Sequence, residues 1–229
     1  MKDHRLRVLF PTDIHANTHV ADSIYEAVVR SNDVSASWIN PTNPQHQHAF
    51  SSVFDEVHGV TVSNNGLNEY ELLKDRNTIA ITLLRATGEL GDWGHFPTPD
   101  AQCLGESTVE YAIAFHGADQ TSRLRTYHDA KNAQIPFSAY QTTIHTGHLK
   151  SKHQYLTIKG DAFALTAMKR KEGGDELITR GYNLTAETSA FSLEIEGLTP
   201  QVCNLLEEQL EEAVKAELTP AEVISYIWN

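Results

Sequence analysis

The 229-residue sequence predicts an all-β fold, an antiparallel β-sandwich with one short helix. The dominant pattern along the chain is an alternation of apolar and polar residues with a period of two, which is typical of half-buried strands. Turn-forming residues separate these segments at short intervals. About ten or more short strands spaced in this way favour a sandwich over a parallel sheet with helical crossovers.

The clearest alternation occurs in two segments. At 109–115 the apolar face consists of Val109, Tyr111, Ile113 and Phe115, and at 191–195 it consists of Phe191, Leu193 and Ile195. Each face is expected to lie on a core. Less regular strand-like segments occur at 6–10, 60–63, 78–85, 155–159, 162–169 and 176–182. Between the last two, Glu172-Gly173-Gly174-Asp175 predicts a hairpin turn.

Two segments depart from the strand pattern. Residues 119–130 predict a short helix, with Asp119 as the N-cap and Leu124, Tyr127 and His128 at helical spacing. Residues 132–152 have no clear period and predict a long loop. Residues 205–218 show apolar residues on one helical face and glutamates on the other, so periodicity alone predicts a second helix there.

Composition excludes several classes of function. Eighteen basic against 30 acidic residues give a net charge of −12, so the chain lacks the basic face that nucleic acids and anionic lipids require. Two distant cysteines make no disulfide framework, and no segment approaches the about 20 apolar residues of a membrane span. Without a linker, a repeat or a signal segment, we expect one domain over 1–229 in a cytoplasmic protein.

Candidate catalytic and metal-binding motifs are weak. His46 and His48, His145 and His148, and Asp13 with His15 and His19 have spacings seen in metal sites, but none has visible further ligands. Cys103 lacks a recognisable histidine partner, and the glycine-rich segment 88–94 lacks the Lys-Ser/Thr of a phosphate loop.

The segment 64–106 contains a concentration of polar and special residues, among them Arg85, Trp93 and Gln102. An aromatic platform with side chains able to make paired hydrogen bonds would suit the vicinal hydroxyls of a sugar. Ordinary turns with a buried Arg–Glu pair would give the same composition, and both interpretations remain open.

Three blocks of the sequence are specific: NNGLNEYE at 64–71, IAITLLRATG at 79–88 and TPDAQCLGE at 98–106. They are followed by VEYAIAFH at 109–116 and by two weaker blocks, AMKR at 167–170 and TRGYNLT at 179–185. In this order the blocks resemble the C-terminal part of glycoside hydrolase family 38, the family of α-mannosidases and bacterial mannosylglycerate hydrolases. The similarity runs from about Arg5 to the end of the chain.

The resemblance implies a galactose-mutarotase-like β-sandwich expressed without its catalytic domain. It also favours a strand followed by a turn over 202–208 and a closing strand at 223–227 in place of the helix, and it leaves a short helical turn open at 211–218. In the family, zinc or another divalent metal and the aspartate nucleophile belong to N-terminal domains that have no counterpart here. We therefore expect no catalytic or metal-binding residue in this chain.

The parent enzyme implied by the resemblance is a retaining glycosidase that hydrolyses α-mannosidic bonds, with a mannoside or mannosylglycerate as substrate. Its C-terminal sandwich packs on the catalytic domain and its loops close one side of the substrate pocket. Arg85 matches a family arginine expected to face that pocket. The residues expected at the pocket rim, or as supports of its loops, are Asn65, Glu69, Tyr70, Gln102 and Glu106.

Two rival hypotheses remain. A free-standing carbohydrate-binding sandwich predicts sugar affinity by the isolated chain and quenching of Trp38 or Trp93 fluorescence. A purely architectural domain, making interdomain or homo-oligomer contacts, predicts a large exposed apolar patch and no sugar affinity. The sequence favours the glycosidase hypothesis through the blocks within 64–106.

Overall fold

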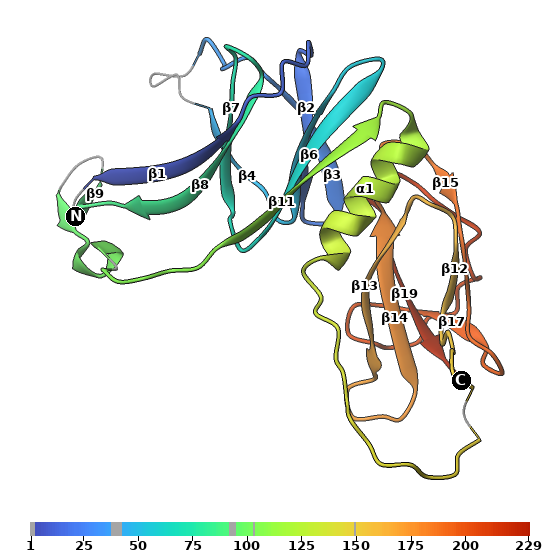
Figure 1. Ribbon diagram of the computed structural model, residues 1–229. Coiled ribbons are helices and arrows are strands. Elements are labelled where there is room, and N and C mark those ends of the chain that lie inside the picture. Colours follow the sequence, from blue (N-terminus) through green and yellow to red (C-terminus); the bar gives the residue numbers. More distant parts are fainter. Residues whose placement is uncertain (1–2, 38–42, 92–94, 103, 149) are drawn as a thin grey trace. The chain divides into compact units, whose positions relative to one another are not determined.

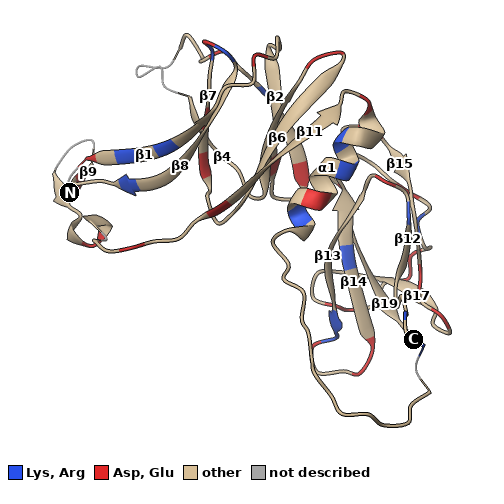
Figure 2. Ribbon diagram, in the orientation of Figure 1, with Lys and Arg blue, Asp and Glu red and all other residues tan. Residues whose placement is uncertain are grey.

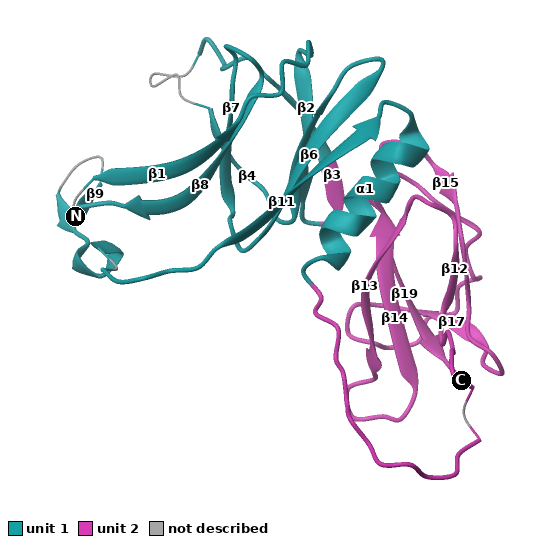
Figure 3. Cartoon of the chain, viewed as in Figure 1, with its two compact units in different colours: residues 1–24, 28–134 teal, residues 25–27, 135–229 magenta. Residues whose placement is uncertain are grey.

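The computed structural model describes residues 3–37, 43–91, 95–102, 104–148 and 150–229. It is built from short antiparallel strands and one α-helix among these residues (Figure 1). The predicted all-β antiparallel sandwich with one short helix is confirmed. The chain divides into two compact units (Figure 3), unit 1 of residues 1–24 and 28–134 and unit 2 of residues 25–27 and 135–229. The assignment of 1–229 to one domain remains a prediction.

Unit 1 contains two larger antiparallel sheets. The first has the strand order β1-β8-β7-β4 and the second β11-β6-β5-β2-β3, where the first two residues of β3 are assigned to unit 2. A small hairpin, β9–β10, and the 3-10 helix η1 complete the unit. The bounds are β1 His4–Phe10, β2 Thr18–Ser23, β3 Glu26–Ser31, β4 Pro44–His46, β5 Phe50–Phe54, β6 His58–Asn65, β7 Glu69–Leu73, β8 Thr78–Ala86, β9 Glu89–Leu90, β10 Phe96–Pro97, η1 Pro99–Gln102 and β11 Glu110–Gly117.

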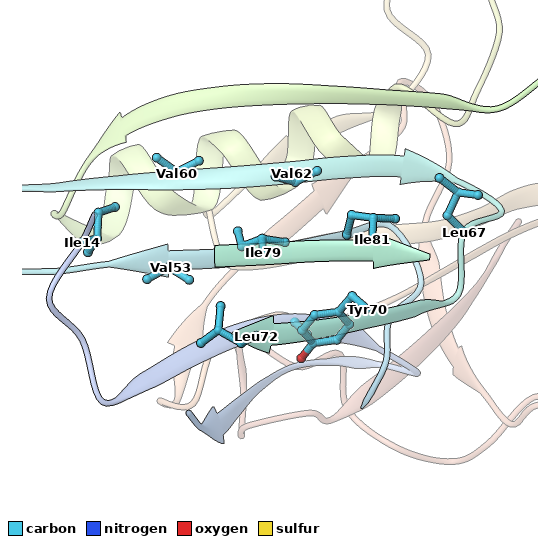
Figure 4. Packing of buried hydrophobic residues seen from close by; sticks show 10 residues of the cluster. Ile14, Val53, Val60, Val62, Leu67, Tyr70, Leu72, Ile79 and Ile81 are labelled. Atoms are coloured by element: carbon cyan, nitrogen blue, oxygen red, sulfur yellow. The ribbon is translucent and has the colours of Figure 1, made fainter. Parts of the chain in front are cut away.

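The core of unit 1 lies between these two sheets (Figure 4). The four-stranded sheet contributes Tyr70, Leu72, Ile79 and Ile81, and the five-stranded sheet contributes Val53, Val60 and Val62. Alternation along β7 directs Tyr70 and Leu72 into this core and therefore places Glu69 and Glu71 on the outer face of the sheet.

The helix α1, Gln120–Asn132, packs on strands of the five-stranded sheet. Its predicted N-cap is confirmed, since the Asp119 carboxylate accepts a hydrogen bond from the amide of Ser122 at 2.9 Å. The ring of Tyr127 stacks on Phe50 with centroids 4.3 Å apart. Toward the end of the helix, Lys131 binds the fully buried carboxylate of Asp22 on β2 at 3.0 Å. The helix is thus held by both apolar and ionic contacts.

Unit 2 is built around a four-stranded sheet of order β13-β14-β19-β17, with two small sheets, β12–β16 and β15–β18. The predicted hairpin at 172–175 is confirmed as the β13–β14 turn, with Gly173 at a φ of 71°. The core includes Phe163 stacked on Phe191, and Trp228, whose indole donates to Thr179. The bounds are β12 Thr157–Lys159, β13 Phe163–Arg170, β14 Leu177–Asn183, β15 Ser189–Ala190, β16 Ser192–Glu194, β17 Pro200–Cys203, β18 Glu217–Leu218 and β19 Val223–Trp228.

The helix predicted from periodicity at 205–218 is wrong, and so is the helical turn left open at 211–218. The chain turns at Asn204, whose side chain accepts hydrogen bonds from the amides of Leu206 and Glu208. Glu207 has a left-handed φ of 66°, which a helix does not allow. Strands precede and follow this segment, as the family resemblance implied.

The strand predicted at 109–115 exists as β11, but the expected burial of its apolar face is wrong. Ile113 is 46% exposed and Phe115 82% exposed, whereas the residues paired with them, Val62 and Val60, are buried. β11 is an edge strand of its sheet, and the core ends at its neighbour β6. The helix extends to Asn132, and the loop predicted at 132–152 is confirmed for its described residues beyond that point, 133–148 and 150–152.

Candidate functional site

The six residues predicted to line a substrate pocket all belong to unit 1, but they lie in five different settings. Only Glu69 and Arg85 form a contact with each other among the interactions of the described residues.

Arg85 and Glu69 belong to a charged cluster on the outer face of the four-stranded sheet. We call Arg5, Arg7, Glu69, Glu71 and Arg85 the Arg85 cluster. These residues belong to β1, β7 and β8, and Figure 2 colours the charged residues of the chain. Nε of Arg5 lies 3.0 Å from Glu69, and Nη1 of Arg7 lies 2.6 Å from Glu71. Nη1 of Arg85 donates to Glu69 at 2.5 Å. The Arg85 side chain remains 51% exposed, so a ligand or a partner can reach it.

Glu69 is the residue that holds the Arg85 guanidinium in place. Its carboxylate also accepts a hydrogen bond from the Thr82 hydroxyl at 2.7 Å. Burial alone would raise the pKa of Glu69, but the Thr82 hydrogen bond and the charges of Arg5 and Arg85 lower it below its ordinary value. Glu69 is therefore a carboxylate at neutral pH that orients a cation, and an unsuitable proton donor.

Sequence reasoning missed Arg5, Arg7 and Glu71 as members of this cluster. The signal was present in the period-two spacing of Arg5 with Arg7 and of Glu69 with Glu71, which puts each pair on one face of its strand. What the sequence could not give is the pairing of β1 and β7 with β8, which brings these two faces together.

Tyr70 lies in the core of unit 1. Its side chain is fully buried, and its hydroxyl lies 2.5 Å from Nε2 of His19 and 3.0 Å from Nη1 of Arg30. Burial raises the pKa of Tyr70 to about 12. Its hydroxyl therefore stays protonated and connects the two sheets through His19 and Arg30.

Asn65 lies beside a shallow pocket of about 190 Å³ formed by β6, β11 and the end of the helix α1. The other lining residues include Glu110 and Tyr111. This volume is below the usual range of about 300–1,000 Å³ for ligand pockets. Gln102, on η1, donates from its amide to the carbonyl of Thr87 at 2.8 Å, and thereby ties η1 to the end of β8. Glu106 is exposed in the loop that follows.

Among the described residues, no group of three or more His, Cys, Asp or Glu side chains could hold a metal ion. His19 is buried and bonded to Asn32 and Tyr70. His46 contacts Ser23 and Arg30, and His145 lies in the exposed loop. The described residues therefore do not fit the zinc that the resemblance assigns to the parent enzyme. Cys103, Trp38 and Trp93 lie outside the described residues.

Comparison with known proteins identifies relatives of the chain. Residues 162–226, within unit 2, match the family described as "Glycosyl hydrolases family 38 C-terminal beta sandwich domain". The resemblance to the C-terminal region of glycoside hydrolase family 38 is confirmed. A curated relative, the "Putative mannosylglycerate hydrolase" of Halalkalibacterium halodurans, is 36% identical over 98% of this chain.

Solved structures agree with this relationship. An α-mannosidase from Enterococcus faecalis V583 is 51% identical over 99% of the chain, with a TM-score of 0.89. A family 38 protein from Enterococcus faecalis is 49% identical, with a TM-score of 0.86. The chain spans about a quarter of the length of these proteins, 25% of the curated relative and 26% of each solved chain.

In the described part of the chain, no helix combines the length and apolar character needed to cross a bilayer.

Proposed function

We propose that the chain is the C-terminal region of a metal-dependent, retaining α-mannosidase-type glycoside hydrolase, and that it supports and partly lines the substrate pocket. The observation that carries this proposal is the 51% identity to an α-mannosidase over 99% of the chain, with a matching fold. In this account the zinc, the nucleophile and the acid/base carboxylate belong to the other part of the parent chain. The substrate is a mannoside or mannosylglycerate, and the isolated chain is inactive.

Arg85 is the residue through which this region takes part in binding. Its guanidinium is half exposed and is fixed by Glu69, which Thr82 and Arg5 hold in turn. A guanidinium fixed in this way presents N–H donors to a sugar hydroxyl or to the carboxylate of a glycerate without a large loss of side-chain entropy on binding. Glu69 is then a positioning residue, and Tyr70 and Gln102 stabilise the strands and turn around it.

The test uses a hybrid enzyme, in which this 229-residue chain replaces its counterpart in the Enterococcus faecalis α-mannosidase. Arg85→Ala in the hybrid enzyme is expected to lower kcat/KM for a chromogenic α-mannoside by about 10- to 100-fold, the loss of one charge-assisted hydrogen bond. The matched control is Arg76→Ala, because Arg76 forms a comparable exposed ion pair, with Asp13, in the same unit. Equal kcat/KM for Arg85→Ala and Arg76→Ala would refute the binding role of Arg85.

The rival carbohydrate-binding function makes a different prediction. If the sandwich binds sugar by itself, titration of the isolated chain with methyl α-mannoside produces saturable heat in calorimetry. The proposed function predicts no such heat, because the pocket forms only with the remainder of the parent enzyme.

A further inference from the structure

A long segment of unit 2 is apolar and is also exposed. We call residues 135–148, which follow the helix α1 and precede β12, the arm (Figure 3). Its four large apolar side chains are Ile135, Phe137, Tyr140 and Ile144, with exposed fractions of 71%, 104%, 91% and 105%. Scattered exposed apolar residues are ordinary, but four in one irregular segment mark an interaction surface.

The composition of the arm does not fit a flexible connection between two units. Residues 132–148 contain no Asp, Glu, Lys or Arg, whereas 21% of the whole chain is charged. Flexible tethers are rich in glycine, serine or charge, and extended linkers in proline. Loops longer than about 12–15 residues without secondary structure are uncommon in compact domains and are usually functional or disordered.

The arm makes few contacts that would hold it against its own unit. Immediately before it, Gln134 donates to the carbonyl of Asn64, which ties the end of the helix region to β6. Within the arm, the side-chain hydrogen bonds of the described residues are local ones among Thr142, Thr143 and His145. The described part of the chain thus leaves Phe137, Tyr140 and Ile144 almost fully uncovered.

In the relatives, the region that matches this chain belongs to a much longer chain. The solved α-mannosidase aligns with 99% of this chain, which leaves about two of 229 residues unaligned, so most of the arm has a counterpart there. The matched region is 26% of that protein, and the other 74% is available as a partner within the same chain. A second copy is a poorer partner, because two chains of net charge −12 repel each other.

We propose that the arm is the docking segment by which this region binds the remainder of its parent glycosidase, with Phe137, Tyr140 and Ile144 inserted into an apolar, uncharged surface. This inference rests on the proposed function. It assigns the interface to a segment outside the Arg85 cluster, on the other unit of the chain.

Chymotrypsin tests the proposal directly, because it cleaves after Phe137 and Tyr140. In the isolated chain both bonds are expected to be cut early, and mass spectrometry identifies the fragments beginning at Ser138 and Gln141. In the hybrid enzyme the same cuts are expected to be at least about tenfold slower, because cleavage then requires the docked arm to open. Equal cleavage rates in the two proteins would overturn the proposal.

Variants separate docking from folding. The double variant Phe137→Ser/Tyr140→Ser is expected to leave the melting temperature of the isolated chain unchanged and, in the hybrid enzyme, to restore rapid thermolysin cleavage of the arm before Ile144. The matched control is Leu206→Ser, because Leu206 is also in unit 2 and is 78% exposed. It is expected to leave arm protection intact. If the double variant lowers the melting temperature of the isolated chain, the arm packs on its own chain and the proposal is wrong.

Two further outcomes are decisive. If protection of the arm in the isolated chain increases with protein concentration and sedimentation shows a dimer, a second copy is the partner and the proposal is overturned.

If the whole hybrid enzyme fails to fold, residues 133–156 alone are grafted into the Enterococcus faecalis enzyme, and the same protection is expected. Hydrolysis of an α-mannoside is scored separately, so a protected arm in an inactive hybrid would contradict the proposed function and leave the docking proposal standing.

Discussion

Replacing Tyr70 with phenylalanine separates a structural from a binding role for this residue. In Tyr70→Phe the ring keeps its place in the core, and only the hydroxyl is lost. The amide of Asn32 donates to the carbonyl of Ala16, so its oxygen accepts from Nδ1 of His19, and Nε2 of His19 is left to accept from the Tyr70 hydroxyl. His19 is 1% exposed, so water cannot replace that donor.

The variant therefore leaves a buried acceptor without a partner, which costs about 1–3 kcal/mol. Arg30 adds little to this figure because it also donates to the carbonyl of His46. A loss of about 2 kcal/mol raises the unfolding equilibrium constant about thirtyfold. Urea unfolding gives the free energy, and amide hydrogen exchange in peptides covering β2 and β7 locates the loss in unit 1.

Tyr140→Phe is the matched control, because Tyr140 is 91% exposed, and its effect is expected to be below about 0.5 kcal/mol. An unfolding free energy of Tyr70→Phe within about 0.5 kcal/mol of the parent value would refute the buried hydrogen-bond network. A large loss of kcat in the hybrid enzyme without loss of stability would restore Tyr70 as a pocket residue.

Three further predictions concern stability. Asp22→Ala removes the fully buried partner of Lys131 and is expected to cost about 3–5 kcal/mol in urea unfolding, whereas Glu194→Ala, in an exposed pair with Lys159, is expected to cost less than about 1 kcal/mol. Gly181→Ala puts a Cβ 2.2 Å from the Phe163 ring and 2.6 Å from the carbonyl of Ala164, and is expected to destabilise unit 2 by about 1–3 kcal/mol, while Gly147→Ala, in open space, leaves the melting temperature unchanged. Burial lowers the pKa of His19 below its ordinary 6.5, so its neutral form stabilises the fold above pH 6.5 and this contribution is lost as the pH falls below that value. The loss of unfolding free energy between about pH 7.5 and 5.5 is thus expected to be smaller in His19→Gln, and an equal loss would contradict this assignment.

The strands and the first helix could be predicted from sequence because local signals specify them. Asp119 caps its helix through a side-chain bond to the amide of Ser122, three residues away, and the apolar alternation at 191–195 corresponds to buried Phe191 and Leu193. The helix expected at 205–218 fails because periodicity records which residues are apolar and not whether a surface covers them. Leu205 and Leu206 are exposed, and the Asn204 side chain stabilises a turn instead.

The candidate site was predictable only in part. Arg85 and Glu69 lie on β8 and β7, which are consecutive in sequence, so their contact can be expected from the sequence. Arg5 joins the Arg85 cluster only because β1 pairs with β8, which brings Arg5 to Thr82, 77 residues away in sequence. For Tyr70, the sequence neighbours suggest an exposed residue, whereas the residue itself is buried. Its neighbours in sequence are charged and partly exposed, yet period-two alternation turns its own side chain into the core, where His19 and Arg30 bind its hydroxyl.

The most direct test of the proposed function compares three proteins in the hydrolysis of a chromogenic α-mannoside with added zinc. They are the isolated chain, the Enterococcus faecalis α-mannosidase without its matched quarter, and the hybrid enzyme that joins the two. The proposed function predicts turnover by the hybrid enzyme and none by either part alone. Turnover by the isolated chain, or a folded hybrid enzyme without activity, would contradict it.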